Sequence, residues 1–355
     1  MVKRNEQRRV TLKDVAELAE VSVFTASRAL SGEGGVSPQA LERVQRAADE
    51  LGYVVNELAR ALRGSKSRML GVLTADIGNA FFGTLVQAID TTAYREGWLV
   101  LSGDPVDEHG HYHPDIEEMF LRSLQQARVA GIIVSYPPAL EKLDDLTTWH
   151  SPLLFVDSTP PKEFQQFPFV VSDGLKGGRL VGEHFAKHGY SRWLLVGHSR
   201  SWATRSSREA GFMEIARQCG ADVEVVEGGN NIAEASSALE RYFDALDGRT
   251  FPDAIFATNE PLLQGCYQAL KGRGIVVGRD VGVIGYDEFA WARLMEPSVT
   301  VVDQDPYQMG CMAATELMRL IEAGGGSPDA VVGGKVFDPR LVVRQSCGCS
   351  ADAST

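Results

Sequence analysis

The chain has 355 residues, of which 44% are hydrophobic, and a formal net charge of -12. This length allows two or three domains. The sequence contains no run of about 18 apolar residues and no apolar stretch after its basic start, so it indicates neither a membrane span nor secretion, and we expect a cytoplasmic protein. The charge is uneven, because residues 1–68 contain twelve Lys and Arg against nine Asp and Glu. Only this N-terminal part is therefore suited to bind a polyanion.

Two short amphipathic helices joined by a tight turn are predicted between Thr11 and Ser31. The first covers about residues 12–19 with Thr11 as its N-cap, and the second covers about nine residues after its cap, Ser22. A third helix begins with a serine cap and a first-turn proline at residues 37–38 and stops at Gly52. This pattern is typical of a helix-turn-helix, whose second helix presents its N-terminal side chains to the major groove. The residues predicted outside or near the ends of that helix are Val23, Phe24, Thr25, Ser27 and Arg28, with Val23, Phe24 and Arg28 best placed to contact bases.

The alternative interpretation is an ordinary helical hairpin at the edge of a larger domain. The segment before the first helix favours DNA binding instead, because residues 1–13 carry five Lys and Arg against Glu6 alone. A basic arm in an otherwise acidic chain is suited to bind phosphates.

Residues 56–64 form a short helix-like segment before a basic Gly/Ser stretch, and a helix of this length is unstable alone in water. Together with residues 12–31 and 38–53, this segment closely resembles the lactose-repressor and galactose-repressor family of bacterial transcription regulators, and the resemblance spans the whole chain. In that family the segment is a hinge helix that forms only on operator DNA, pairs with its twin from the other subunit and inserts a leucine into a minor-groove base step. The resemblance places Leu62 in the leucine position and Ala59 one turn earlier, against the groove. The alternative is that Leu62 is merely an apolar linker residue.

One position departs from the family pattern in the helix-turn-helix. The turn usually carries glycine before the Val-Ser pair, and this chain has Glu20 there. A side chain disfavours a left-handed backbone, at a cost of about 1 kcal/mol. We expect the unit to tolerate that cost.

After residue 68 the pattern changes to apolar strands that alternate with amphipathic helices. The strand candidates are residues 69–73, 98–101, 131–134, 153–156, 169–171, 193–196, 223–226, 254–257, 281–284 and 299–302. Short apolar strands separated by helices indicate parallel sheets covered on both faces, and so many strands favour two doubly wound lobes. The resemblance implies the same core, like that of periplasmic sugar-binding proteins, with three crossings between lobes. We place these crossings near residues 164–169, 286–289 and 302–306.

The predicted fold class is an all-α helix-turn-helix head followed by an α/β core of two doubly wound parallel-sheet lobes. The predicted segments are residues 1–54 for the DNA-binding domain, 55–67 for the hinge helix and linker, 68–346 for the effector-binding and dimerisation core, and 347–355 for the tail. The tail has no leucine heptads, which favours a homodimer over a tetramer held by a tail coil.

Residues that follow the predicted strands are candidates for a ligand site, because ligands of doubly wound sheets bind outside the strand carboxyl ends. Asp76, Phe81 and Phe82 lie in residues 76–82, which resemble a family motif at the start of a helix. The two aromatic rings could stack on a ligand or belong to the core. Asp157 and Asp173 also follow strands.

Residues 202–212, which begin with Trp202, carry a stronger resemblance. The family uses an arginine three residues before a Gly-Phe pair to hold effector hydroxyls or carboxylates, and Arg208 has this position. The alternative is an exposed helix arginine. The resemblance also implies effector contacts for Asn259 and Asp287, and Gln304 completes the set from a crossing segment. Such polar groups converging with aromatic residues are typical of a sugar pocket.

Two features leave the effector chemistry open. Glu260 stands where the family mostly has aspartate, and its role is not evident from the sequence. Lys176, Arg200 and Arg205, together with His198, would favour a sugar acid if their side chains face the site.

The five cysteines are expected to be reduced, since cytosolic thiols rarely pair and their number is odd. Cys347 and Cys349 form a Cys-Gly-Cys sequence, but no second Cys or His pair at suitable spacing accompanies it, so we predict no metal and no cofactor. His109, His111 and His113 alternate in a polar stretch that is more typical of a solvated loop. The sequence lacks a Gly-x-Ser-x-Gly elbow, a Walker motif and carboxylates paired at diagnostic spacing, so we predict no enzymatic activity.

The sequence therefore predicts a homodimeric transcription regulator, usually a repressor in this family, of a carbohydrate-utilisation operon. It would bind palindromic operator DNA and respond to a sugar or sugar acid held between the lobes. A purine corepressor is an alternative effector, which the Phe81–Phe82 pair permits. A transport-type sugar-binding protein would share the core, but the basic head and the missing signal peptide argue against it.

Overall fold

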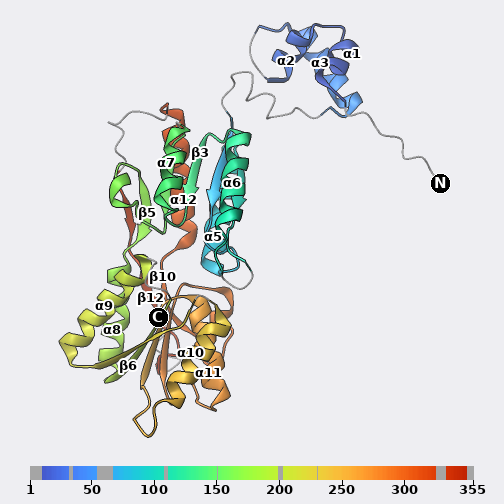
Figure 1. Ribbon diagram of the computed structural model, residues 1–355. Coiled ribbons are helices and arrows are strands. Elements are labelled where there is room, and N and C mark those ends of the chain that lie inside the picture. Colours follow the sequence, from blue (N-terminus) through green and yellow to red (C-terminus); the bar gives the residue numbers. More distant parts are fainter. Residues whose placement is uncertain are drawn as a thin grey trace. The chain divides into compact units, whose positions relative to one another are not determined.

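The computed structural model describes residues 10–31, 35–53, 67–107, 111–149, 151–198, 203–229, 231–324 and 333–349. The chain divides into two compact units, residues 1–67 and 68–355, and each is considered by itself (Figure 1). No helix in the described part of the chain is both long enough and apolar enough to span a membrane.

In residues 10–31 and 35–53 of the first unit three helices form a bundle, α1 (Leu12–Leu18), α2 (Val23–Ser31) and α3 (Pro38–Leu51), which confirms the three predicted helices. Thr11 and Asp14 form a reciprocal capping box at the start of α1, and the Ser37 side chain caps α3. Alanine and valine side chains from all three helices form its core; they are Val15, Ala16, Ala19, Ala26, Ala29, Val44, Ala47 and Ala48. A closed core of small side chains holds the helices close together.

The turn between α1 and α2 places Glu20 at a φ of 55°, the left-handed conformation that its family position requires. The Val21 amide donates to the Ala16 carbonyl at 3.0 Å, so the turn closes as it would with glycine. The predicted backbone strain is therefore present at Glu20, and the helix bundle forms despite it.

The first lobe of the second unit has one six-stranded sheet in the order β11-β5-β4-β3-β1-β2, and every pairing in it is parallel. The strands are β1 (Met69–Leu73), β2 (Leu99–Gly103), β3 (Gly131–Val134), β4 (Leu153–Val156), β5 (Phe169–Ser172) and β11 (Lys335–Phe337). Helices α5 (Ala80–Arg95) and α12 (Pro306–Glu322) pack on one face, and α6 (Pro114–Ala127) and α7 (Leu140–Thr148) pack on the other. A short 3-10 helix covers Lys162–Phe164.

The second lobe repeats this plan with the sheet order β12-β10-β9-β8-β6-β7. The strands are β6 (Arg192–Gly197), β7 (Asp222–Glu227), β8 (Ala254–Ala257), β9 (Gly282–Tyr286), β10 (Thr300–Asp303) and β12 (Arg340–Val342), of which β12 is antiparallel to β10. Helices α8 (Gly174–Lys187) and α9 (Ala203–Cys219) cover one face, and α10 (Ile232–Asp244) and α11 (Glu260–Gly272) cover the other. A second 3-10 helix covers Ala290–Arg293. Two doubly wound lobes are therefore confirmed.

The three crossings between lobes follow β5, β10 and β11, because the next element packs in the other lobe each time. The crossing predicted at residues 302–306 is confirmed. The crossings predicted at 164–169 and 286–289 are wrong, since the chain continues to β5 within the first lobe and from β9 to β10 within the second. The actual crossings lie just after Ser172 and between Phe337 and Arg340.

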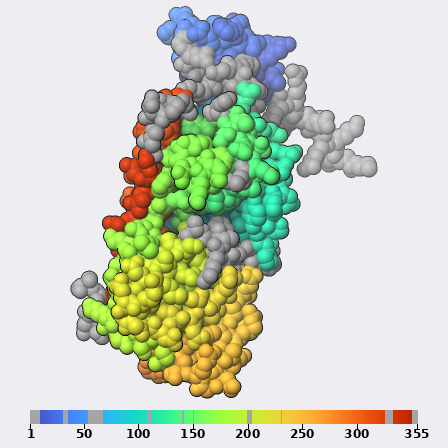
Figure 2. Space-filling model, turned by 60° about the vertical axis from the view of Figure 1, so that its left-hand side comes forward, coloured from blue at the N-terminus to red at the C-terminus, as the bar shows by residue number. Residues whose placement is uncertain are grey.

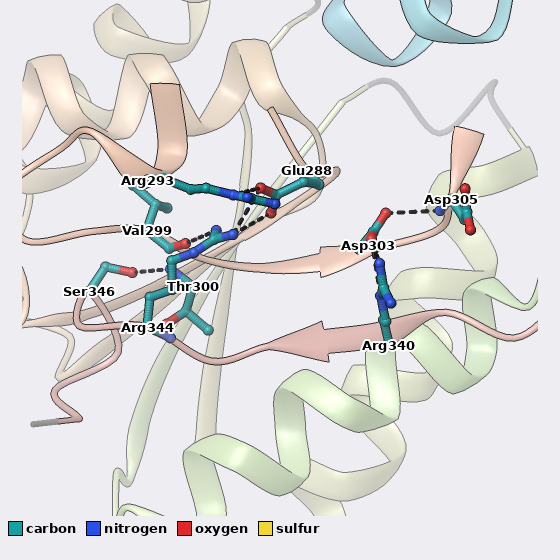
Figure 3. Close-up of polar contacts among 9 residues, drawn as sticks. All are labelled: Glu288, Arg293, Val299, Thr300, Asp303, Asp305, Arg340, Arg344 and Ser346. Carbon is teal, nitrogen blue, oxygen red and sulfur yellow. Dashed lines mark hydrogen bonds and ion pairs between the residues drawn. The ribbon is translucent and has the colours of Figure 1, made fainter. Parts of the chain in front are cut away.

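The third crossing was misplaced because β11 and β12 were not predicted. Each has only three residues, none of which is buried, so they lack the apolar run that marked the other strands. β11 is placed by its pairing with β5. Two ion pairs hold β12 and the segment after it, since the Arg340 guanidinium lies 2.8 Å from Asp303 and the Arg344 guanidinium lies 2.8 Å from Glu288 (Figure 3). Because the second crossing follows β10, α12 lies against the first lobe, as the red surface in Figure 2 shows.

Candidate functional site

Four aspartates lie just beyond the carboxyl ends of strands with positive φ angles. Asp76 follows β1 with φ 118°, Asp157 follows β4 with φ 56°, and Asp287 follows β9 with φ 77°. The fourth, Asp305, follows β10 with φ 57° and caps α12. Positive φ is strained for residues with a side chain, and such strain gathers where a side chain must be aimed at a site. These strand ends are also where doubly wound folds bind ligands.

Arg208 on α9 is the central side chain of this region and is 5% exposed. Its Nη1 donates to the Thr258 carbonyl at 2.6 Å, and its Cζ lies 3.8 Å from the centroid of the Tyr286 ring. Its Nη2 lies 3.5 Å from Gln304 Oε1. The alternative of an exposed helix arginine therefore does not hold.

Close packing of α8 on α9 positions Arg208. A Cβ at Gly178 would lie 2.0 Å from the Arg208 carbonyl oxygen, and a Cβ at Gly211 would lie 2.0 Å from the Leu175 carbonyl oxygen. Both positions therefore require glycine, because any side chain would force the helices apart. The Gly-Phe pair that marked Arg208 in the sequence thus has a structural reason.

Two carboxyl groups accompany this guanidinium. Burial raises the pKa of Asp157 to about 7 and that of Asp287 to about 6, while Arg208 acts in the opposite direction on both. Gln304 donates a hydrogen bond from Nε2 to Asp287 Oδ1, which orients that carboxyl. Asp157 comes from the first lobe and Asp287 from the second, so the group joins both lobes at their strand ends.

Glu260 makes a direct connection between the lobes. Its Oε2 accepts from the Ala80 amide at the start of α5 at 3.1 Å, and its Oε1 accepts from Trp291 Nε1 at 2.8 Å. The side chain is 5% exposed. An aspartate side chain is one methylene shorter than glutamate. The departure from the family pattern therefore gives this chain a carboxylate that extends further at the lobe junction.

The remaining predicted residues have different environments. Phe81 is 2% exposed and belongs to the core of the first lobe, whereas Phe82 is only partly buried. Asn259 caps α11 by accepting from the Leu262 amide at 3.0 Å, which uses its side-chain oxygen. Asp76 accepts from the Gly78 amide at 3.0 Å, and burial and Asp104 raise its pKa. Trp202 lies outside the described residues.

Two of the three additional cations proposed from the sequence already have acidic partners. Arg205 Nε lies 3.1 Å from Glu209, and Lys176 Nζ lies 2.9 Å from Asp338. Burial and the neighbouring arginines lower the pKa of His198 to about 3, so its ring is neutral near pH 7. Arg200 lies outside the described residues. Arg208 therefore supplies the positive charge beside Asp157 and Asp287.

Tyr286 and Thr258 contact Arg208 and were not among the predicted site residues. Tyr286 is completely buried in β9 and looks like an ordinary core residue in the sequence, as does Thr258 after β8. The signal available for both was their position at the carboxyl end of a predicted strand.

The exposed surface of α2 carries the residues predicted to contact DNA bases. Phe24 is 70% exposed and Val23 is 41% exposed, while Ala26 and Ala29 face the core. The Arg28 Cζ lies 5.7 Å from the Phe24 ring centroid, so the two side chains share one face. The Ser22 hydroxyl accepts from the Thr25 amide at 3.0 Å and caps the helix, and Ser27 is partly buried. Ala59 and Leu62 lie outside the described residues.

A helix-turn-helix with an exposed aromatic on its second helix, and a two-lobed core with a polar cluster at its strand ends, define the class of ligand-responsive DNA-binding regulators. Residues 11–56 match the model for bacterial regulatory proteins of the lacI family, and residues 183–347 match that for a periplasmic binding protein-like domain.

Known proteins extend this match over nearly the whole chain. The ribose operon repressor of Bacillus subtilis is 31% identical over 315 residues, which cover 88% of this chain and 92% of the relative. The repressor PurR of Vibrio atlanticus is 27% identical over 316 residues, with 88% and 92% covered. The structure of the Lac repressor dimer bound to operator and an anti-inducer superimposes with a TM-score of 0.81 at 25% identity, covering 96% of this chain and all of that one.

The chain therefore belongs to the LacI family of bacterial transcription regulators. It is a DNA-binding transcriptional repressor with an effector-binding domain, and not an enzyme.

Proposed function

We propose that this repressor binds a palindromic operator as a homodimer, controls carbohydrate-utilisation genes, and responds to a neutral sugar held between its lobes. The observation that carries this proposal is the group of Arg208, Asp157, Asp287 and Gln304 at the strand ends of both lobes. Carboxyl, amide and guanidinium groups at one place can donate to and accept from several hydroxyls of one ligand.

The charges favour a neutral sugar over a sugar acid. Burial raises the pKa of Asp157 and Asp287, and the charge of Arg208 partly offsets that rise at both. An anionic ligand would bring a further negative charge to these two carboxyls, which is unfavourable in a buried site. Sugar hydroxyls instead donate to the carboxyls and accept from the guanidinium. The names of two relatives, a ribose operon repressor and a regulator in complex with cellobiose, agree with a sugar ligand.

A purine corepressor remains the second candidate. It requires an aromatic ring that is free to stack on a base. Phe82 is partly buried and supports this candidate, while burial of Phe81 in the core weakens it.

A thermal-shift screen with the full chain tests the ligand class. The panel pairs each neutral sugar with its aldonic or uronic acid and adds purine bases and nucleosides. A ligand at 100 times its Kd stabilises the folded state by about 2.7 kcal/mol. We expect a neutral sugar to raise Tm in the wild type and to have no effect on Arg208→Ala. A response to the acid or the purine alone would overturn the neutral-sugar proposal.

On the DNA side, we assign base contacts to Val23, Phe24 and Arg28 and minor-groove insertion to Leu62. An apolar side chain that inserts between base pairs makes this contact only in the complex with DNA. Leu62→Ala should therefore reduce operator affinity and bending while ligand affinity and dimer formation remain as in the wild type. An unchanged bend angle in a DNA circularisation assay would remove Leu62 from this role. The boundaries 1–54, 55–67 and 68–346 remain our proposal for the head, hinge and core.

We assign part of the dimer interface to β2, an edge strand of the first lobe. Leu99 is 54% exposed and Leu101 is 37% exposed, and as alternate residues of one strand they share a face. Exposed apolar neighbours on an edge strand mark an interaction surface. The double change Leu99→Lys and Leu101→Lys should give a monomer in light scattering, whereas Leu294→Lys, at an 82% exposed leucine of the second lobe, should not. A dimeric double variant would place the interface elsewhere.

A further inference from the structure

Four potential metal ligands meet at the outer end of the second lobe, away from the strand-end site. His184 lies in the last turn of α8 and His188 is its C-cap, while Cys347 and Cys349 follow β12. One ligand atom from each of these four side chains lies within 4.8 Å of the other three. The sequence predicted no metal, on the ground that no second Cys or His pair at suitable spacing accompanies Cys347 and Cys349. The fold overturns that ground, because it brings His184 and His188 to them from about 160 residues earlier.

The distances between the ligand atoms agree with tetrahedral coordination of one metal ion. A tetrahedral zinc with Zn–S of about 2.3 Å and Zn–N of about 2.05 Å places sulfur and nitrogen ligands about 3.6 Å apart. Cys349 Sγ lies 3.2 Å from His188 Nε2 and 3.8 Å from His184 Nε2, on either side of that value. The two histidines are one helical turn apart, so their rings lie side by side, with centroids 4.7 Å apart.

Neighbouring residues hold the ligands in place, as in built metal sites. The Thr300 hydroxyl donates to Cys347 Sγ at 3.1 Å, and the Tyr190 hydroxyl donates to the Cys347 carbonyl at 3.0 Å. The Tyr190 ring stacks on the His188 ring with centroids 5.6 Å apart. Gly348 has a φ of 87°, which brings both flanking cysteines to the same side.

The chain before the cysteines is equally well fixed. The Arg344 guanidinium bonds to Glu288 and to the Val299 carbonyl, and the Ser346 hydroxyl accepts from the Thr300 amide at 2.8 Å (Figure 3). This segment follows the third crossing between the lobes, and α8 follows the first. An ion at this position therefore joins the two segments that enter the second lobe from the first.

We propose that His184, His188, Cys347 and Cys349 bind one Zn²⁺ ion and fasten the C-terminal segment to the end of α8. Two imidazoles and two thiolates are a donor set that zinc accepts in closed, structural sites. The ion compensates the negative charge of two thiolates that are close together. The function is structural, and it is independent of the ligand between the lobes.

Metal analysis and cobalt substitution of the full chain test the proposal. The wild type purified under reducing conditions should contain about one zinc per chain, and Co²⁺ should give the intense visible absorption of tetrahedral thiolate coordination. Cys349→Ser and His188→Asn change partly exposed ligands, so they leave the core of the lobe intact. Each should lower zinc affinity by more than about 100-fold, beyond the loss seen when only outer-shell partners are removed. Cys219→Ser and Cys311→Ser are the matched controls and should bind as the wild type does.

Three outcomes would overturn the proposal. One is a wild-type cobalt spectrum without thiolate coordination. Another is the same spectrum and zinc affinity in Cys349→Ser as in the wild type. The third is a Cys347–Cys349 disulfide that mass spectrometry finds in protein purified without reductant and that still forms when zinc is present. Cobalt spectra and competition with zinc on the wild type decide the question even if a variant fails to fold.

Discussion

Replacing Arg208 by methionine removes the charge from the strand-end site and retains most of the side-chain volume. The wild-type guanidinium donates to the Thr258 carbonyl at 2.6 Å and offsets the charges of Asp157 and Asp287. Arg208 acts on the two carboxyls through its charge, and removing a charge that compensates buried carboxylates costs about 3–5 kcal/mol, as when one partner of a buried ion pair is removed. We expect a loss of that size in the free energy of unfolding at pH 8.

The loss in the free energy of unfolding should be smaller at pH 5 than at pH 8. The reason is the protonation of the two carboxyls. Their folded pKa values, about 7 for Asp157 and about 6 for Asp287, lie above the ordinary value of 3.8. Their contribution to stability is therefore present at low pH and is lost as the pH rises through 6 to 7. At pH 5 both groups are largely protonated, and Arg208→Met then removes mainly a hydrogen bond from a charged donor, worth about 1.5–3 kcal/mol.

Urea unfolding at pH 5 and pH 8, without ligand, measures both values. Tryptophan fluorescence reports the core, because all five tryptophans follow residue 68. Arg249→Met is the control, since Arg249 pairs with Glu224 on the surface at 3.4 Å and should contribute less than about 1 kcal/mol. A loss for Arg208→Met that is below 1 kcal/mol at pH 8, or equal at both pH values, would refute this account of the cluster.

Three further predictions concern Phe24, Glu20 and Glu260. Phe24→Ala should weaken operator binding by about 1 kcal/mol or more and leave binding to random DNA unchanged, since base contacts alone discriminate; equal losses in anisotropy titrations on both DNAs would remove Phe24 from base recognition. Glu20→Gly should stabilise the helix-turn-helix by about 1 kcal/mol, because φ is 55° there, and amide exchange in α1 that is no slower would show that the turn is not strained. Glu260→Gln can keep an oxygen acceptor for the Ala80 amide, although its amide nitrogen cannot accept from Trp291 Nε1, so it should retain more lobe closure in small-angle scattering with ligand than Glu260→Ala does; identical curves for both variants would make this contact dispensable.

Most of the fold was predictable because burial leaves a clear pattern. Strands at residues 69–73, 131–134, 153–156 and 254–257 were predicted with their observed bounds, since they are short, apolar and covered on both faces. The helices of the first unit were predictable from Thr11, Ser37 and Gly52, which act as the caps that their residue types favour.

The crossings were not predictable from such a pattern. Residues 164–169 and 286–289 look like loops between strands, and whether a loop changes lobes depends on which sheet its next strand joins. The three-residue strands β11 and β12 settle this through pairing and ion pairs, notably Arg340 with Asp303. A single ion pair leaves no periodic signal in the sequence.

Site residues that belong to a sequence motif were predictable. Site residues that are identified only by their contacts in the fold were not. Arg208 could be placed from the Gly-Phe pair, whose glycine allows α8 to approach α9. The stacking on Tyr286 and the approach of His184 to Cys349 involve residues far apart in the chain, so only the fold brings them together. Glu260 looked like a departure from the family and proved to be a contact between lobes.

A ligand at Arg208 and operator DNA should change each other's affinity for the repressor. Operator affinity is measured by anisotropy with and without the ligand that the thermal-shift screen identifies, and ligand affinity is measured by calorimetry with and without operator. Both affinities should change by the same factor, corresponding to about 1–3 kcal/mol, because coupling between two sites is reciprocal. Arg208→Ala should abolish the ligand effect. Equal ligand affinity in free and operator-bound protein would contradict the claim.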